Sequence, residues 1–400
     1  MIPRHCPPFS SGSLLRTLFR SFKQVSRFEL EKRYARRLNV PHAVWLPSAR
    51  YGITRILQYQ TKSDSTIACP VFNCGAVHHA AAECERTIEF IDTASGSFLV
   101  DCSRQTSTGH GVILSELFGH QFNERDLRQP FVKQAASRVF DLAMCIPTVG
   151  DVERMSPGDV SVLSFGLGKS LYAGWGGMAF TSCLETATML KRRRDQDLQT
   201  CSRMNRAKWN SSFLVRTLAH ERPFYGPIRS RRKHSGTSDT NSTTSFSTDT
   251  YEWHRPATNL HLQQCLSNLD ESGAWAEKRT TLAEVYRSQL TQFRPVIRMP
   301  DKDSQGHSHF VVCVPAELRD KVCDQLWHRG IDAGKLFPFP TNHCDPLKFP
   351  RASQAASEVI NLPLSNRLTE RHVTHICRSL IEIMERLPTS TTFCTQREAA

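Results

Sequence analysis

Seven short apolar runs, separated by turns and helix-length segments, constrain the fold of this chain more than any other feature. The runs occupy residues 43–45, 65–69, 87–91, 111–114, 137–140, 159–164 and 178–181. Strand-like runs that alternate with helical patterns predict an α/β domain whose mainly parallel sheet has helices on both faces. A sheet of this kind places its ligand-binding loops at the carboxyl ends of the strands.

The C-terminal part of the chain predicts a second, smaller α+β domain. One or two long helices over 260–285 precede a strand at 309–314, a helix at 316–328, a strand at 359–362 and a helix at 369–387. A chain of 400 residues is also longer than one small core can use. We therefore predict an N-terminal arm over 1–27, a large domain over 28–270, a small domain over 271–390 and a tail over 391–400.

Residues 229–250 interrupt this pattern. They begin with a basic run and continue as a Ser/Thr-rich stretch with few apolar side chains. So little apolar surface cannot offset the entropy of ordering the chain, and we predict a flexible surface insertion. For the basic run, a solvated loop is favoured over a nucleic-acid contact.

The arm over 1–27 is basic, contains no acidic residue and has apolar side chains at helical spacing. These side chains are Leu14, Leu15, Leu18, Phe19 and Phe22. They could form a targeting or membrane-surface helix. An arm packed on the following domain is favoured, because the pattern continues directly into a charged helix over 28–38.

Composition limits the environment and the partners. The 51 Lys and Arg against 38 Asp and Glu give a net charge of +13, which favours anionic partners such as phosphorylated small molecules. The 14 cysteines are scattered without CxxC pairs, which indicates reduced thiols and a cytoplasmic protein. No apolar segment is long enough to span a membrane, and the histidines lack metal-ligand spacing, so we predict no membrane span and no metal.

Lys169 lies in a short loop, residues 164–169, between two apolar runs and shortly before the glycine-rich segment 174–177. An amine held at the mouth of a sheet can form a Schiff base with a carbonyl, the linkage that holds pyridoxal phosphate. Taken alone, a solvated loop lysine is the more common explanation. Other segments of the chain make the first interpretation stronger.

Three segments supply groups that such a cofactor needs. Ser48 is a plausible helix N-cap, and the backbone N–H groups of Ala49 and Arg50 behind it would attract a phosphate. Asp141 ends an apolar strand, where a buried carboxylate needs a cationic partner such as a protonated ring nitrogen. Ser164 could give a hydroxyl to the same phosphate. Each segment alone also fits an ordinary cap, turn or buried serine.

In this order, the segments resemble the DegT/DnrJ/StrS family of pyridoxal-phosphate sugar aminotransferases, which have the type I aspartate aminotransferase fold. The resemblance extends from about residue 28 to residue 387. Residues 48–50 stand at the family's phosphate turn, 70–74 resemble its Pro-x-x-Thr-aromatic loop, 140–143 fall on Glu-Asp-Ala-Ala, 164–165 match Ser-Phe, and 359–364 resemble the Leu-Pro-Leu-His strand. Lys169 stands at the position of the Schiff-base lysine.

The resemblance implies an aminotransferase that uses pyridoxal 5'-phosphate, with Lys169 and Asp141 as catalytic residues. Glutamate or glutamine would donate the amino group, and a keto-sugar, carried on a nucleotide, would accept it in polysaccharide or specialised-metabolite biosynthesis. The implied cofactor-binding residues are Ser48, Ala49, Arg50, Phe72, Cys74, Asp141, Ser164 and Lys169. Family members are homodimers, and Arg255 and Asn259 are candidates for reaching the neighbouring subunit, although an ordinary helix entry fits them equally.

The chain also departs from the family pattern. Phe140, Met144 and Trp175 replace residues that are usually polar and lie close to the cofactor and the dimer contact, and Asn73 replaces a threonine. None of these changes removes the lysine, the aspartate or the phosphate turn. A protein of the same fold with altered or lost transaminase activity therefore remains an alternative, as does a non-catalytic anion-binding regulator. Relatives that catalyse dehydration have histidine in place of the lysine, so Lys169 argues against that branch.

Overall fold

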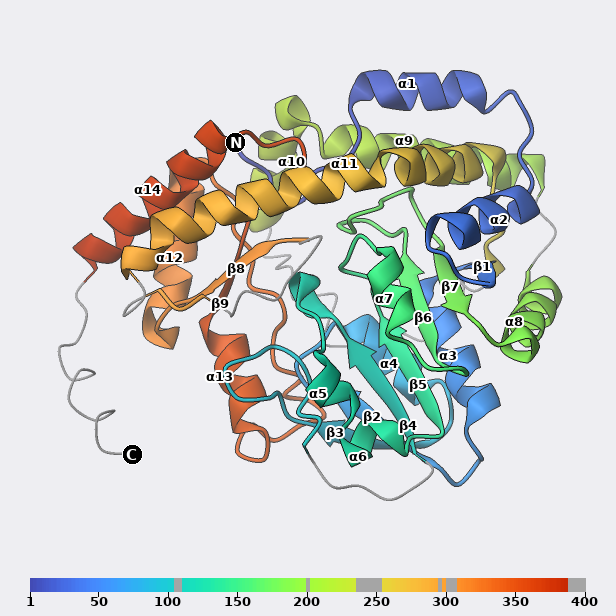
Figure 1. Ribbon diagram of the computed structural model, residues 1–400. Helices are drawn as coiled ribbons and strands as arrows, with labels where there is room; N and C mark the ends of the chain where they lie inside the picture. The colour runs from blue at the N-terminus through green and yellow to red at the C-terminus, as the bar shows by residue number, and fades with distance from the viewer. Residues whose placement is uncertain (104–109, 199–201, 235–253, 294–296, 300–307, 388–400) are drawn as a thin grey trace.

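The computed structural model describes residues 1–103, 110–198, 202–234, 254–293, 297–299 and 308–387 (Figure 1). Its large domain is built on a seven-stranded sheet. The strands are β1 (His42–Leu46), β2 (Thr66–Pro70), β3 (Thr87–Ile91), β4 (Gly111–Ser115), β5 (Ser137–Asp141), β6 (Val160–Ser164) and β7 (Gly177–Thr181). Each strand lies where an apolar run of the sequence predicts it.

The strand order is β1-β7-β6-β5-β4-β2-β3. Strand β7 runs antiparallel to its neighbours β1 and β6, whereas the other neighbouring pairs are parallel. The predicted α/β fold with a mainly parallel sheet is therefore confirmed. Because β5 and β6 are parallel neighbours, Asp141 and Ser164 end their strands at the same edge of the sheet.

Helices cover both faces of this sheet, as a parallel sheet with two apolar faces requires. The helices of the large domain are α2 (Arg27–Arg37), α3 (Ala49–Gln60), α4 (Gly75–Ala82), α5 (Glu124–Leu127), α6 (Pro130–Lys133), α7 (Val149–Glu153) and α8 (Leu184–Asp197), with a 3-10 turn, η1 (Leu117–Gly119). On one face, Val139 and Val162 pack with Ile56 of α3. On the other face, Trp45 and Met178 share a core with the helix α2 residue Leu30.

A small domain follows a single long helix, α11 (Asn259–Leu290), where the sequence predicts one or two helices. It contains β8 (Phe310–Cys313), α12 (Ala316–His328), α13 (Pro350–Glu358), β9 (Val359–Leu362) and α14 (Glu370–Arg386), after the 3-10 turn η4 (Thr291–Phe293). Trp275 of α11 belongs to the core of the large domain, and Tyr286 belongs to the core of the small one. Helix α11 therefore joins the two domains without a loop (Figure 1).

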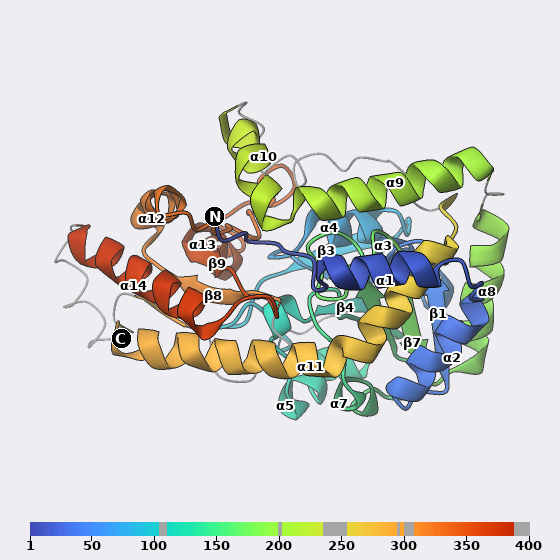
Figure 2. The same ribbon diagram turned by 90° about the horizontal axis from the view of Figure 1, so that it is seen from above.

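The N-terminal arm contacts both domains. Helix α1 (Ser11–Arg20) lies along α11 (Figure 2), and its Leu14 is buried in the core of the large domain. Before it, Ile2 pairs with Ile331 of the small domain. The arm is thus packed along most of its length, and no helix among the described residues is long and apolar enough to cross a bilayer.

Two further helices, α9 (Arg203–Ala219) and α10 (Arg222–His234), lie between α8 and α11 in the chain. The prediction of a flexible insertion starting at residue 229 is wrong for its first part, because the basic run 229–233 belongs to α10. The run continues the amphipathic pattern of the preceding residues, and Tyr225 is buried one turn earlier. The Ser/Thr-rich part from 235 onward lies outside the described residues.

Candidate active site

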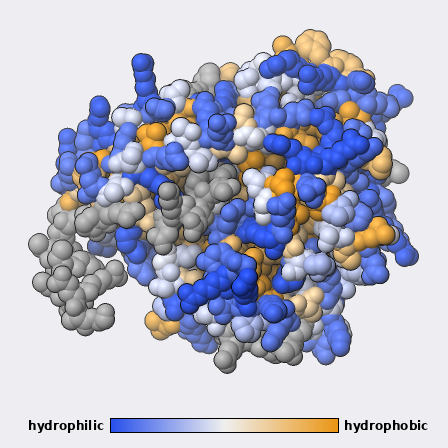
Figure 3. Space-filling model, in the orientation of Figure 1, coloured by the Kyte–Doolittle hydropathy of each residue, from blue (hydrophilic) through white to orange (hydrophobic). Residues whose placement is uncertain are grey.

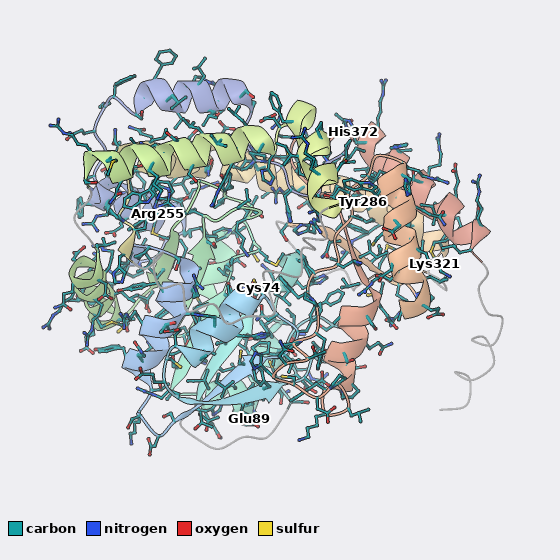
Figure 4. The ribbon with its side chains drawn as sticks, turned by 180° about the vertical axis from the view of Figure 1, so that it is seen from behind. Cys74, Glu89, Arg255, Tyr286, Lys321 and His372 are labelled. Carbon is teal, nitrogen blue, oxygen red and sulfur yellow. The ribbon has the colours of Figure 1, made fainter. Side chains whose placement is uncertain are left out.

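A cavity of about 210 Å³ lies at the carboxyl ends of strands β5 and β6, between the sheet and the small domain. Its lining includes Ser48, Ala49, Arg50, Cys74, Asp141, Ser164 and Lys169. Figure 4 shows Cys74 near the centre of the molecule, where the two domains face each other. The structure therefore brings together every predicted cofactor-site residue except Phe72.

The phosphate turn is the N-terminus of helix α3. Ser48 is its N-cap, and the Ser48 Oγ accepts a hydrogen bond from the Tyr51 N–H at 3.1 Å. The backbone N–H groups at the start of a helix carry partial positive charge, so this helix end favours an anion in the cavity. Arg50 adds a guanidinium to the same wall.

Gly177 allows the turn to approach the sheet. A Cβ atom at Gly177 would lie 2.6 Å from the Leu163 carbonyl oxygen and 2.8 Å from the Ala49 amide nitrogen. Both are backbone atoms that cannot move aside without disturbing β6 or the first turn of α3. The position of the phosphate turn therefore depends on the absence of a side chain at Gly177.

We predict that Gly177→Ala lowers the free energy of unfolding by about 1–3 kcal/mol, the usual cost of overpacking. It should also weaken binding of inorganic phosphate, because the start of α3 must shift. The matched control is Gly150→Ala on α7, where a Cβ would lie 3.8 Å from the Thr148 Oγ1. Denaturant unfolding and phosphate titration measure both effects, and equal stability of the two variants would contradict the prediction.

Asp141 is held by a chain of hydrogen bonds. Its Oδ1 accepts from the Ala143 N–H at 3.0 Å, and its Oδ2 accepts from the Ser115 hydroxyl at 3.2 Å. Asn73 Nδ2 donates to the same Ser115 Oγ at 2.7 Å. Burial raises the pKa of Asp141, while the positive charge of Lys169 and these hydrogen bonds oppose the rise. The carboxylate is thus oriented, and a second cation beside it would stabilise its ionised form.

The loop that carries Lys169 is fixed by its own backbone and by the arm. The Phe165 N–H donates to the Gly176 carbonyl at 2.9 Å, and the Ala173 N–H donates to the Phe165 carbonyl at 3.0 Å. Gly168 has φ +79°, a conformation that suits glycine, and a Cβ there would lie 3.3 Å from the His5 Nδ1. The loop therefore presents Lys169 to the cavity while His5 of the N-terminal arm closes its far side.

His5 meets a second buried histidine. The His309 Nε2 lies 3.3 Å from the His5 Nδ1, and the His309 Nδ1 lies 3.1 Å from the Ser308 hydroxyl. Burial, then the charges of Arg4, Arg279 and Lys169, lower the pKa of His309 to about 3. Burial also lowers the pKa of His5, with His309 as the next contribution. Both imidazoles are therefore neutral at pH 7 behind the lysine loop.

A third buried histidine, His261, predicts that the folded protein loses stability in acid. Burial lowers the pKa of His261 to about 4. In the unfolded chain a histidine binds its proton at about pH 6.5, so between pH 6.5 and pH 4 the unfolded state holds more protons and stability falls as the pH falls. His261 alone accounts for about 3 kcal/mol over that range. The free energy of unfolding, measured at several pH values, should depend less steeply on pH in His261→Gln than in the wild type. An unchanged slope in His261→Gln would contradict the prediction.

Phe72 is not part of the cavity wall. It is buried behind Cys74 in an aromatic cluster, with ring centroids 5.5 Å from Phe98 and 6.1 Å from Phe337. Phe337 of the small domain lines the cavity instead. The wall also contains residues that the sequence did not suggest as site residues, namely Ile53, Asn73, Ala76, Val77, Leu117, Ala143 and Met144. Among them, Met144 and Asn73 depart from the family pattern, and Ala143 belongs to the segment 140–143 that resembles it.

Trp175 and the two subunit-contact candidates lie outside this wall. The Trp175 ring stacks on His261 with centroids 4.5 Å apart, and the Arg255 guanidinium lies 3.9 Å from the Trp175 ring centroid. In Figure 4, Arg255 lies well apart from Cys74. The Asn259 Oδ1 accepts from the Val25 N–H at 2.9 Å, and its Nδ2 donates to the Lys23 carbonyl. These intrachain contacts anchor the start of α11, and a contribution to a neighbouring subunit stays a prediction.

The cavity therefore combines three different groups on separate elements. A helix N-terminus and Arg50 favour an anion, Asp141 favours a cation, and Lys169 lines the same cavity as the apolar side chains of Met144 and Phe337. A flat molecule with a phosphate at one end, a protonated ring nitrogen at the other and a carbonyl between them matches these groups. The residues present fit pyridoxal phosphate on this chemistry.

Comparison with known proteins finds a family match over the C-terminal part of the chain. Residues 241–381 match the model of the DegT/DnrJ/EryC1/StrS aminotransferase family. The erythromycin biosynthesis sensory transduction protein EryC1 of Saccharopolyspora erythraea is 30% identical to this chain over 127 residues, in a match that covers 29% of this chain and 33% of EryC1. The chain thus matches about a third of the length of that curated relative.

Solved structures show the same fold over nearly the whole of this chain. The sugar aminotransferase CalS13 from Micromonospora echinospora has a TM-score of 0.71 at 15% identity, over 96% of this chain and 100% of CalS13. Helicobacter pylori PseC, an aminotransferase involved in pseudoaminic acid biosynthesis, has a TM-score of 0.71 at 15% identity, over 96% of this chain and 100% of PseC. NtdA from Bacillus subtilis, solved with its cofactor PMP, has a TM-score of 0.69 at 16% identity, over 94% of this chain and 82% of NtdA.

Proposed function

We propose that this protein is a pyridoxal-phosphate-dependent aminotransferase that moves an amino group from glutamate or glutamine to a keto-sugar carried on a nucleotide. The observation that carries the proposal is the cavity in which Lys169, Asp141 and the N-terminus of α3 meet. The family match and the fold of CalS13, PseC and NtdA support it. The net charge of +13 suits a substrate with a diphosphate.

Each residue has a defined part in this reaction. When bound, pyridoxal phosphate supplies an aldehyde that exchanges amines and a ring that accepts electrons. The start of α3, Arg50 and Ser164 would bind its phosphate, and Asp141 would keep the ring nitrogen protonated. Lys169 would hold the aldehyde through its Nζ and, when this amine is free, would move the proton at the substrate carbon.

A second candidate keeps the cofactor but not the transamination. Met144 lines the cavity at the position where the family has glutamine or histidine. A thioether cannot donate the hydrogen bond that those side chains provide. A protein of this fold with altered or lost transaminase activity would bind pyridoxal phosphate in the same cavity and differ only in its response to amino donors.

Absorbance of the purified protein separates these functions. The proposal predicts a yellow protein, or one that becomes yellow with added pyridoxal phosphate, whose visible band glutamate or glutamine bleaches. A band that no amino donor bleaches favours the second candidate. A colourless protein that takes up no cofactor would instead favour a non-catalytic anion-binding regulator and contradict both.

The cellular setting follows from the family resemblance. We infer a homodimer in the cytoplasm, acting in polysaccharide or specialised-metabolite biosynthesis. Every cysteine that the structure describes carries a free thiol, which supports a reducing compartment. Sedimentation of the purified protein tests the dimer directly.

A further inference from the structure

The outer surface formed by the helices α1, α9 and α10 gathers exposed apolar side chains. Leu15, Phe19 and Phe22 belong to α1 and the residues just after it, Met204, Val215 and Leu218 to α9, and Phe224 and Ile228 to α10. Figures 1 and 2 show α1 and α9 lying side by side along one side of the molecule. Soluble proteins rarely leave so many large apolar side chains together in water unless they meet a partner.

The exposed stripe is the face of each helix that points away from the fold. In α1, Ser13, Leu14 and Thr17 are buried, whereas Leu15, Phe19 and Phe22 repeat at helical spacing on the opposite face. Phe19 is 66% exposed and Phe22 is 87% exposed. In α9, Trp209, Phe213 and Thr217 are buried, and Met204, Val215 and Leu218 face outward. Packing on α11 therefore uses only one face of α1 and leaves the other in contact with solvent.

The same surface is strongly basic. Arg16, Arg20 and Lys23 are exposed between the apolar side chains of the arm, and Arg203, Arg206, Lys208 and Arg216 are exposed on α9. No acidic residue occurs in residues 11–28 or 202–220. In Figure 3, hydrophobic and hydrophilic side chains alternate on the upper edge of the molecule, over α1.

We propose that this basic-apolar surface, formed by α1, α9 and α10, docks the protein on a membrane that contains anionic phospholipids. Aromatic and aliphatic side chains would enter the boundary between headgroups and acyl chains, and the Arg and Lys side chains would bind phosphate groups beside them. The side chains protrude from convex helices. A fluid bilayer can receive them without a preformed pocket, whereas a protein partner would need a matching groove.

A second copy of the chain is a less suitable occupant. In a two-fold contact the same surface meets itself, so the seven exposed cations named above would face an equal set with no acidic residue between them. Anionic headgroups neutralise these charges instead. The charge of the surface therefore favours the membrane over self-association.

Vesicle co-sedimentation of the full chain tests this proposal, and its outcome does not depend on the proposed enzyme activity. The wild-type protein should bind vesicles of phosphatidylcholine with phosphatidylserine, and bind poorly to phosphatidylcholine alone. Phe19→Ser with Phe22→Ser should remove most of the binding. Leu347→Ser is the matched control, because Leu347 is 88% exposed on the small domain.

Charge variants test the electrostatic part. Arg16→Glu with Arg20→Glu should lower the partition onto anionic vesicles by at least about 20-fold, the effect of removing two basic residues near such a surface. Lys321→Glu with Arg378→Glu makes the same charge change on the exposed surface of α12 and α14 (Figure 4) and should have little effect. Circular dichroism confirms that each variant is folded.

Four results would overturn the proposal, and the first three concern vesicle binding. They are an absence of wild-type binding to anionic vesicles, equal binding of the Phe19 and Phe22 double variant, and equal binding of the Arg16 and Arg20 double variant. A fourth is a concentration-dependent dimer, seen by sedimentation velocity, that the Phe19 and Phe22 changes dissociate. That result would assign the surface to a contact between copies of this chain.

Discussion

Replacing Lys169 by alanine is expected to abolish transamination and the visible absorbance of the protein with pyridoxal phosphate. The lysine would supply both the amine that holds the cofactor and the base at the substrate carbon, so turnover should fall by at least about 10⁴-fold. Lys169→Arg keeps the positive charge beside Asp141 but lacks a nucleophilic amine. It should be as inactive as the alanine variant while retaining its fold.

The comparison between Lys169→Ala and Lys169→Arg separates the effect of the positive charge from that of the nucleophilic amine. Lys62→Ala, on the exposed segment after α3, serves as the control for removing a lysine elsewhere. Absorbance titration and single-turnover bleaching by glutamate provide the measurements. A Lys169→Ala protein that still shows a band bleached by glutamate would mean that another residue holds the cofactor.

Asp141→Asn is expected to have the second largest effect. The side chain would keep its place at the end of β5 but could not stabilise a protonated ring nitrogen. Loss of one preorganised charge at a reacting centre predicts a fall in turnover of roughly 10²–10³-fold. Cofactor affinity, measured by absorbance titration, should fall as well.

The free energy of unfolding of Asp141→Asn should not fall, although its turnover does. Burial raises the pKa of Asp141, so ionisation of this carboxyl at neutral pH costs folding free energy. The asparagine side chain would carry no charge, and the cofactor-free variant should therefore be at least as stable as the wild type at pH 7. This combination of lost activity and kept stability is typical of a site residue.

Asp159→Asn is the matched control. Asp159 is buried at the start of β6 and forms an ion pair with Arg138 at 2.6 Å, away from the cavity. Its replacement removes a buried carboxylate that does not line the cavity, so turnover and the cofactor absorbance should be retained. If Asp141→Asn keeps its turnover as Asp159→Asn does, Asp141 has only a structural role.

The sheet could be predicted because each strand is a short apolar run with two buried faces. The same applies to Asp141 and Ser164, since a polar residue at the end of such a run marks the functional edge of a parallel sheet. Lys169 could be found only through its order relative to these residues. Its loop conformation depends on Gly168 and on His5 of the arm, and no pattern local to the lysine encodes the contact with His5.

The features of the site that could not be predicted depend on contacts between segments far apart in the sequence. Phe337 replaces Phe72 in the cavity wall because the small domain folds over the sheet, and no local pattern of residues encodes that approach. The hydrogen bonds from Asn73 through Ser115 to Asp141 link three strand ends whose register the sequence does not specify. The family pattern predicts position 175 close to the cofactor, but the stacking of Trp175 on His261 of α11 places its ring in the core.

Reductive trapping of the cofactor tests most directly whether Lys169 binds pyridoxal phosphate. Borohydride would reduce the linkage between a lysine and pyridoxal phosphate to a stable secondary amine, and peptide mass analysis then identifies the modified residue. We predict one phosphopyridoxyl group per chain, on the peptide that contains Lys169. We predict none when the protein is first incubated with an amino donor and no keto acceptor. A label on a different lysine, or no label at all, would contradict it.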